Sequence, residues 1–504
     1  MALPNVKVNV DEQTLIASNT AIPFTPALLL KTKSGPIGTV ETITSESQFK
    51  AIFGDSDYTT PSAYALQVYL RSYSYAYVTR IANSNSASLG TGTLTFLDSD
   101  EETVSLISAS TDYKTDLFNG KEIKLVYDGT AHKLWLDLSS IKGKTTISIK
   151  EDYTADTATA VTLSGVLTNL VNSVNSANLG ITLTNLFVEK IASDKVPTVA
   201  QLTNGLSFYI SGGDSGNGTD VDTTDVLKYI DLYDTTAVDF DVMVIPEYTS
   251  AEVVNYATKL ALKNNFMVLT SPNVNTVQNA IQAVANYDDE NRGSLAVYFP
   301  NVYYSNFVDN NGNKVSIPAS VAVLTTYAKT DITYKWSAPA GVTRGKLSLV
   351  KGLVTKLTEE DLTTLYDNVI PINGINDISG KGYIVWGNKT TTASSTFFDR
   401  INVARLVKYI TKQAYLISWN YLFEPITNSV FDDWIMKMES FLNNIKVGYG
   451  LDDYALTMDS SINTNETIAN NQLNAIIKIK PTEVAEFITI DLTVTDTIEI
   501  TIES

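Results

Sequence analysis

Residues 241–269 read DVMVIPEYTSAEVVNYATKLALKNNFMVL, and this stretch decides the fold class. The short apolar run from Asp241 to Ile245 predicts a buried strand. A helix is expected near 250–263, and a second buried strand is expected over Phe266–Leu269. Strands that alternate with helices predict an α/β (α+β) architecture, in which helices cover both faces of a mixed sheet.

Upstream, residues 21–82 continue this pattern and are expected to form the first part of the same core. Ser45 precedes phenylalanines at helical spacing and Gly54 follows them, which predicts a capped helix between these two residues. A second helix is predicted over 61–72 and a strand over 75–81.

The composition changes after residue 82, which predicts several domains in one chain. Residues 83–205 are rich in Thr and Ser and contain alternating segments such as GTLTFLD, EIKLVYD and KLWLDL, so we expect a β-rich inserted domain. Residues 206–390 return to the α/β pattern and are expected to be the second part of the core. Residues 391–486 are expected to be its C-terminal helical part, with amphipathic helices near 399–419 and 429–446.

Both ends of the chain carry alternating apolar residues, the pattern of a half-buried strand. We interpret residues 1–20 as an N-terminal arm and residues 487–504 as a C-terminal strand arm. A terminal strand with one apolar face pairs either with the sheet of a neighbouring chain or with its own domain, and periodicity leaves both open. The apolar positions of the two arms are Val6, Val8 and Val10, then Ile488, Ile490, Leu492, Val494, Ile498, Ile500 and Ile502.

The overall composition favours a folded protein that binds no nucleic acid directly. Of the 504 residues, 44% are hydrophobic and 18% are charged, as in globular proteins. The formal net charge of -19 repels a phosphate backbone. No stretch is apolar enough to span a membrane, and residues 1–16 lack the pattern of a signal peptide. We therefore expect a soluble protein made in the cytoplasm, without membrane insertion.

The residue types needed for most catalytic and metal sites are missing. The chain has no cysteine and one histidine, His132, which excludes thiolate nucleophiles, Cys zinc sites and multi-histidine metal centres. The glycine-rich run from Gly212 to Gly218 lacks the Lys of a P-loop and the spacing of a calcium loop, so we expect a tight turn. Nothing marks out one pair of carboxylates for glycoside hydrolysis. We predict no catalytic residue, no cofactor and no metal.

A series of motifs resembles, in its order, the tail sheath family of contractile phages and related injection machines. The resemblance covers most of residues 1–82 and 206–495, and residues 83–205 match nothing, as is expected of a variable outward-facing insertion. The motifs are SGPIGTVETITSESQFKAIFG (34–54), YVTR (77–80), SGGDSG (211–216), DFDVMVIP (239–246), SIPASVAV (316–323), TYAKTD (326–331), APAG (338–341), GYIVWGNKT (382–390), DRINVARLVKYI (399–410), FEP (423–425) and AEFITI (485–490).

The resemblance implies a structural subunit and not an enzyme. Sheath subunits polymerise into a helical cylinder around an inner tail tube, and the cylinder contracts to drive the tube through the host envelope. The implied partners are neighbouring subunits in stacked hexameric rings, held by donated terminal arms, together with the tube protein, the baseplate and the tail terminator. The implied location is the tail of a virion assembled in the host cytoplasm.

Four cations on one predicted helix suggest a contact with the tube. They cluster in an otherwise acidic chain, and a solvated helix face is the alternative. Two other kinds of protein share the general composition: a self-assembling surface or fibre protein of the S-layer type, and a carbohydrate-active enzyme. The candidate tube-facing residues are Arg400, Arg405, Lys408 and Lys412.

Overall fold

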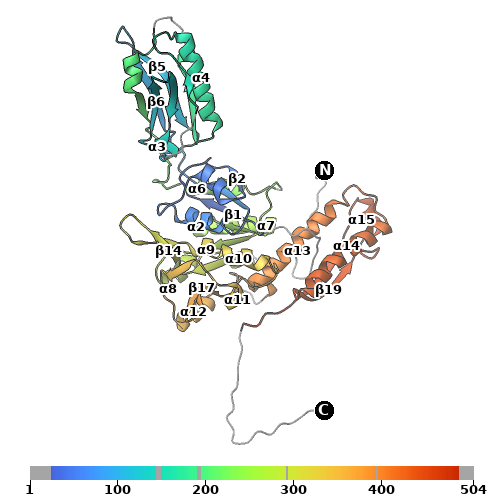
Figure 1. The fold of residues 1–504 in the computed structure, drawn as a ribbon. Coiled ribbons are helices and arrows are strands. Elements are labelled where there is room, and N and C mark those ends of the chain that lie inside the picture. Colours follow the sequence, from blue (N-terminus) through green and yellow to red (C-terminus); the bar gives the residue numbers. More distant parts are fainter. Residues whose placement is uncertain are drawn as a thin grey trace, which may run out of the picture. The chain divides into compact units, whose positions relative to one another are not determined.

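The computed structural model describes residues 24–142, 149–189, 195–218, 220–235, 237–290, 293–392 and 396–486. The chain divides into two compact units, one that ends at Lys408 and one that begins at Tyr409. We call them the large unit and the C-terminal unit. Many of their helices and strands are labelled in Figure 1.

A mixed sheet built from eight of the described strands lies at the centre of the large unit. In spatial order the strands are β18 (Gly382–Trp386), β17 (Ile372–Ile378), β13 (Leu295–Phe299), β12 (Met267–Thr270), β11 (Val242–Val244), β1 (Pro26–Leu30), β3 (Ala76–Arg80) and β2 (Val40–Ile43). The inner strands are parallel, and β18 and β2 pair antiparallel at the two edges. The predicted fold class is therefore confirmed.

Apolar side chains on both faces of this sheet are buried under helices. Along β1, Leu28 and Leu30 belong to one buried cluster, and Ala27 and Leu29 belong to another, because successive side chains point to opposite faces. The first cluster includes residues of α1 (Glu46–Phe53), α2 (Pro61–Tyr69), α9 (Ala319–Ala322) and α10 (Leu324–Asp331). The second includes residues of α6 (Thr223–Asp231), α7 (Ala251–Asn264), α8 (Val277–Val284) and α12 (Glu359–Tyr366).

The helix ends and the order of elements predicted for the core are found in the structure. The Ser45 side chain accepts a hydrogen bond from the backbone N–H of Gln48 and caps α1, and Gly54 ends that helix with φ at 80°. The quoted stretch forms β11, α7 and β12 in that order. A smaller sheet lies beside the main one and contains β15 (Lys314–Ile317), β14 (Val302–Val308) and β16 (Val350–Leu353). Two short helical segments also belong to the large unit: α11 (Gly341–Arg344) precedes β16 in the chain, and η2 (Phe397–Asp399) precedes α13.

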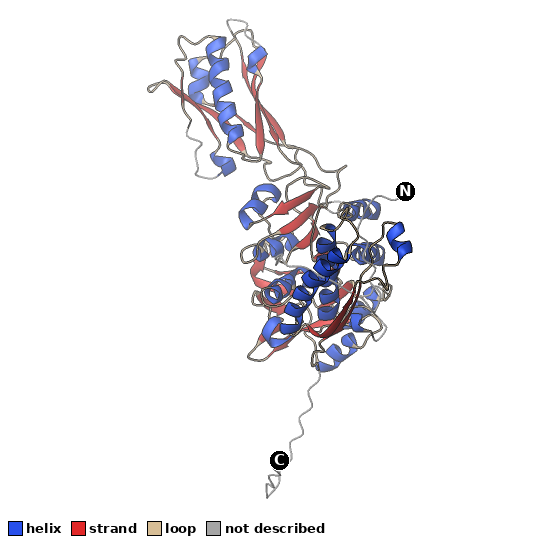
Figure 2. Ribbon diagram, turned by 90° about the vertical axis from the view of Figure 1, so that its right-hand side faces the viewer, coloured by secondary structure: helices blue, strands red, loops and turns tan. Residues whose placement is uncertain are grey.

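The insertion has its own buried core and a long helix, which Figure 2 shows lying along the strands. Its strands β4 (Thr91–Leu97), β5 (Thr103–Thr111) and β9 (Ile181–Asn185) form one sheet. The other sheet contains β10 (Leu206–Tyr209), β6 (Glu122–Asp128), β7 (Lys133–Asp137) and β8 (Glu151–Asp152). The helical segments are α3 (Ser139–Lys142), α4 (Ala160–Ser176), η1 (Phe187–Glu189) and α5 (Val199–Asn204).

This arrangement corrects two details of the prediction. Residues 206–209 were expected to begin the second part of the core, but β10 pairs with β6, so the insertion continues through this strand. The domain is also less purely β than its alternating segments suggested. Leu163, Leu167 and Leu170 of α4 recur at helical spacing and are buried, and this packing outweighs the low helix propensity of the surrounding Val, Thr, Ser and Asn.

The sequence predicted that residues 391–486 are helical, but the C-terminal unit also contains two strands. Helix α13 (Ile401–Trp419) crosses the boundary between the units, and α14 (Asn428–Val447) follows it. Then come β19 (Leu451–Thr457), α15 (Asn465–Ala469) and β20 (Ile476–Pro481). Among the described residues, no helix is long and apolar enough to cross a membrane.

Candidate assembly site

The C-terminal unit contains a small antiparallel sheet, formed by β19 and β20. The pairing runs from Leu451 opposite Pro481 to Thr457 opposite Ile476. Among the described strands, neither of these two pairs with a third. Among the described residues both outer edges are therefore unpaired, and an unpaired edge presents backbone donors and acceptors that a further strand can use.

Helix α14 supports this sheet. The Thr427 side chain caps its first turn by accepting a hydrogen bond from the Val430 amide. Phe431, Trp434, Met438, Phe441, Leu442 and Ile445 are buried along one face, which confirms the apolar stripe predicted from their spacing. The ring of Tyr409 lies 5.4 Å from that of Phe441, and the Trp434 indole donates to the Ser418 hydroxyl at 3.3 Å. The second half of α13 thus packs on α14.

The two faces of the small sheet differ in character. Ile477 is fully buried, whereas Lys478 and Lys480 on the alternate positions are exposed. Lys480 pairs with Asp452 of β19 at 3.1 Å. The Lys446 ammonium of α14 lies 2.7 Å from Asp453 and holds the pKa of that carboxyl below its usual value. One face is thus apolar and covered, and the other is charged.

The predicted arms lie outside the described residues. This holds for Val6, Val8 and Val10, and for Ile488, Ile490, Leu492, Val494, Ile498, Ile500 and Ile502. The described part of the chain stops at Glu486, shortly after β20 ends at Pro481. In sequence, the C-terminal arm therefore follows directly after the small sheet, and its pairing stays a prediction.

Two aromatic side chains of the C-terminal unit are exposed on strained backbone. Phe423, between α13 and α14, is 86% exposed with φ at 70°, and Tyr449, after α14, is 83% exposed with φ at 58°. A bulky residue in the left-handed region costs conformational energy, so such positions persist only where the surrounding structure enforces them. Phe423 belongs to the FEP motif, whose exposure the sequence did not reveal.

Two of the four predicted tube-facing cations have partners inside the large unit. Arg405 is 7% exposed and pairs with Asp331, and Lys408 is 9% exposed and donates to the Ser294 hydroxyl at 2.9 Å. Buried cations with internal partners present no charge to another protein, so the structure gives these two residues an internal role. Arg400 lies 2.9 Å from Asp399, and Lys412 is half-buried. A contact of this helix with a tube stays a prediction.

The glycine-rich turn after β10 is explained by close backbone packing. A Cβ atom on Gly213 would lie 2.1 Å from the Thr115 carbonyl oxygen, and one on Gly216 would lie 2.6 Å from that of Asn83. Gly216 also has φ at 73°. The tight turn predicted from the sequence is confirmed, because only glycine fits positions where backbones approach this closely.

A buried arginine lies in the same region, where the insertion joins the core. Arg80 ends β3, and its guanidinium donates to the carbonyl oxygens of Gly35 at 2.6 Å, Lys114 at 2.9 Å and Ser215 at 2.6 Å. Burial lowers the pKa of Arg80 to about 10, so the side chain stays charged at neutral pH. Three carbonyls from separate segments thus fix one cation at the base of the insertion.

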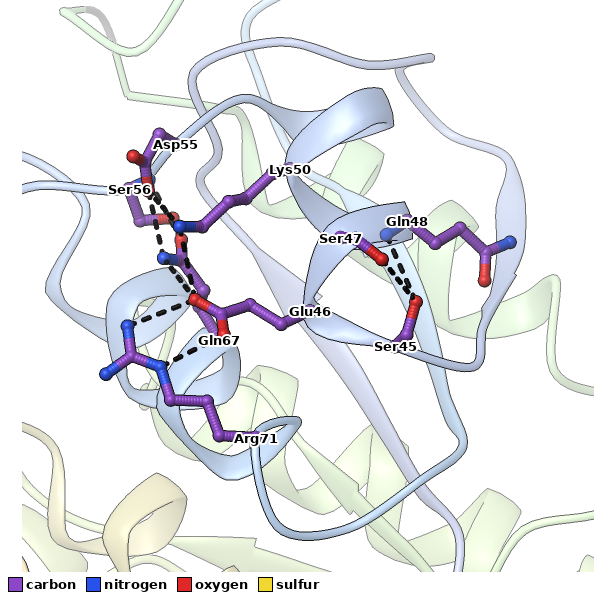
Figure 3. A network of polar contacts seen from close by, with 9 residues as sticks. All are labelled: Ser45, Glu46, Ser47, Gln48, Lys50, Asp55, Ser56, Gln67 and Arg71. Atoms are coloured by element: carbon purple, nitrogen blue, oxygen red, sulfur yellow. Dashed lines mark hydrogen bonds and ion pairs between the residues drawn. The ribbon is translucent and has the colours of Figure 1, made fainter.

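A polar network on the surface links α1 to the end of α2 (Figure 3). The Glu46 carboxylate accepts from Arg71 at 3.0 and 3.1 Å and from Gln67 at 3.2 Å, and it pairs with Lys50 at 3.2 Å. Lys50 also lies 3.4 Å from Asp55. The hydrogen bonds from Arg71 lower the pKa of Glu46. All partners are satisfied within the chain, so this cluster has a structural explanation.

Two observations on the described residues concern the catalytic and metal sites considered from the sequence. His132 is exposed in the turn between β6 and β7. Within the described ranges, no three acidic or histidine side chains are grouped closely enough to hold a metal ion.

Comparison with known proteins gives sequence relatives for part of the chain. The chain is 29% identical over 194 residues to the tail sheath protein of Vibrio phage KVP40, and 29% identical over 231 residues to that of Enterobacteria phage T4. A third relative, the tail sheath protein of Salmonella phage ViI, is 30% identical over 169 residues. The matches cover 33% to 44% of this chain and 26% to 34% of the relatives. No family model matches.

Solved structures share the fold over nearly the whole chain. The sheath tail protein from Desulfitobacterium hafniense has a TM-score of 0.58 at 11% identity, with 91% of this chain and 94% of that one covered. The contracted sheath of the extracellular injection system PVC has a TM-score of 0.56 at 13% identity, with 98% of both chains covered. The chain is therefore related to phage tail sheath proteins in part of its sequence, and its fold is that of a contractile sheath subunit.

Proposed function

We propose that this chain is a structural subunit of a contractile tail sheath. It polymerises into a helical cylinder around an inner tube, and the cylinder contracts to drive the tube through the host envelope during genome delivery. The observation that carries the proposal is the sheath-subunit fold, which extends over at least 91% of the chain in the solved structures compared above. The sequence relatives, all of them tail sheath proteins of phages, support it independently.

The open sheet of the C-terminal unit supports a specific mode of assembly. Its strands β19 and β20 have unpaired outer edges among the described residues, and the predicted C-terminal strand arm follows β20 in the sequence. A donated strand adds backbone hydrogen bonds at such an edge. We propose that the arms of neighbouring copies complete this sheet. A repeated head-to-tail contact of this kind generates a helix and needs only one type of subunit.

The partners follow from this role. They are neighbouring copies, stacked as hexameric rings, an inner tube protein along the cylinder, and a baseplate and a tail terminator at its ends. The location is the virion tail, after assembly in the host cytoplasm. We propose no catalytic function, because the sequence relatives and the solved structures that share the fold are sheath proteins.

Negative-stain microscopy of the purified full-length chain at several salt concentrations tests this proposal. Hollow striated cylinders are the expected result. Dispersed monomers under all conditions, with or without the tube protein of the same particle, would contradict it. A surface or fibre protein would instead form flat lattices or thin filaments, and a carbohydrate-active enzyme would cleave polysaccharides in a parallel assay.

A further inference from the structure

A buried ion pair joins the beginning of α13 to α10. The Arg405 guanidinium contacts the Asp331 carboxylate, and both side chains are less than a tenth exposed. The guanidinium carbon also lies 4.9 Å from the centre of the Tyr327 ring. The Tyr327 hydroxyl is in turn hydrogen-bonded to that of Tyr298 on β13 at 2.6 Å. The first turns of α13 are thus held on the main sheet by charge as well as by packing.

The same network reaches the start of β1 and β11. Lys335 lies 3.5 Å from Asp331 and 3.5 Å from Asp241, the residue before β11. The second carboxylate oxygen of Asp241 accepts a hydrogen bond from the backbone amide of Thr25 at 3.0 Å. The Asp331 and Arg405 side chains are the buried members of this network, and those of Lys335 and Asp241 are 13% and 20% exposed. The network thus extends from α13 to the residue before β1.

Three separate motifs of the sequence converge on this network. Asp241 comes from DFDVMVIP, Asp331 from TYAKTD, and Arg405 from DRINVARLVKYI. Residues 241, 331 and 405 are far apart in sequence, so no local pattern reveals that they meet. Burial raises the pKa of Asp331, and the Arg405 guanidinium opposes that shift. Removing one partner leaves the other charge buried without compensation, which costs more than the loss of an exposed pair.

The position of the network in the chain suggests what it does. Thr25 lies five residues after the predicted N-terminal arm (residues 1–20), and α13 continues past Arg405 into the C-terminal unit, which in sequence precedes the predicted C-terminal arm. We propose that the network of Asp241, Asp331, Lys335 and Arg405 is a tension-bearing junction, which transmits a pull on the N-terminal arm directly to α13. The proposal rests on the proposed function, since the arms are under tension only in a polymer that contracts.

Single-molecule pulling tests the junction on isolated chains. The chain has no cysteine, so handles attach only at the chosen positions. In the first geometry the handles are at the N-terminus and at Asn420→Cys, so the chain from β1 to α13, with all four network residues, lies between them. In the second they are at Thr42→Cys and Tyr75→Cys, which bound a part of the core that contains none of the four residues. Asp331→Asn is expected to speed rupture at fixed force roughly tenfold in the first geometry and to leave the second unchanged.

Two further variants keep the test decisive. Asp220→Asn makes the same chemical change in the exposed Lys31–Asp220 pair, and is expected to leave rupture unchanged in both geometries. Arg405→Lys keeps the charge but loses the planar fork, and replaces Asp331→Asn if that variant does not fold. If Asp331→Asn speeds rupture equally in both geometries, the variant has lost stability in general. If it does not speed rupture in the first geometry, the network has no role under load. Either result overturns the junction, while failure to form cylinders under the microscope would instead overturn the sheath function.

Discussion

The main sheet of the large unit and the small sheet of the C-terminal unit are built on opposite plans. The main sheet ends in the antiparallel strands β18 and β2, and both of its faces are buried under helices. The small sheet has one covered face, one charged face and, among the described strands, two open edges. The main sheet thus has both faces covered within one chain, whereas the small sheet has only one covered face, and its unpaired edges can accept a further strand.

This difference separates folding from assembly. A complete core with both faces covered sets the stability of the subunit, because most of the apolar surface is buried there. An open edge offers little stability to its own chain but a ready hydrogen-bonding partner to another. Changes in the main sheet should therefore alter folding, and changes at the small sheet or the arms should alter polymerisation.

The largest effect is expected from deletion of residues 487–504. The truncated chain should remain folded, with an unchanged thermal midpoint by circular dichroism, and should form no cylinders under the microscope. The reason is that the donated strand is removed while the main sheet stays intact. Unfolding of the truncated chain would assign the arm to its own domain and erase the distinction between the two sheets.

A cavity in the main sheet should have the reverse effect. Leu28 on β1 is fully buried, and Leu28→Ala is expected to lower the free energy of unfolding by about 2–5 kcal/mol. Leu349→Ala, at a position that is 43% exposed, is the matched control, with an expected change of about 0.5 kcal/mol or less. Denaturant titration measures both. The account fails here if the buried variant keeps its stability but no longer polymerises.

A buried carboxyl group makes the stability of the large unit depend on pH. Burial raises the pKa of Glu247, just after β11, from 4.5 to about 7. The folded state therefore keeps its proton while the unfolded chain loses it, and stability should fall as pH rises from about 4.5 to about 7. Glu247→Gln should remove this decline and stabilise the chain by about 3 kcal/mol at about pH 8. A parallel decline in the variant, measured by thermal melts across this range, would exclude Glu247 as its cause.

The smallest effect is expected at the exposed face of the small sheet. Lys480→Met removes the pair with Asp452, but both side chains are largely in contact with solvent. The thermal midpoint should stay within error of the parent chain. If cylinders of the variant dissociate at lower salt than those of the parent, the charged face also takes part in assembly, which would sharpen the comparison.

Local sequence signals predicted much of the core. Features that depend on contacts between residues far apart in the sequence could not be predicted in this way. Ser45 and Gly54 bound α1 as expected, because caps act within a few residues. Helix α4 was missed because its Thr, Ser and Asn residues favour other structures, and only packing of the buried leucines makes it helical. Arg405 was read as a surface cation because its partner, Asp331, lies in another element. The pairing of the arms stays a prediction. Strand β20 was not predicted, although its Ile477, Lys478, Ile479 and Lys480 alternate as in a half-buried strand.

The central claim is that strands of another copy complete the small sheet, and disulfide trapping between two differently tagged copies tests it most directly. One copy carries Thr489→Cys in the arm, and the other carries Ala455→Cys on β19 or Lys478→Cys on β20. The chain has no cysteine of its own, so every bond is assignable. The account predicts a mixed disulfide between the two tags under polymerising conditions. A disulfide that forms only when both cysteines are in the same chain, and never between the tags, would contradict it.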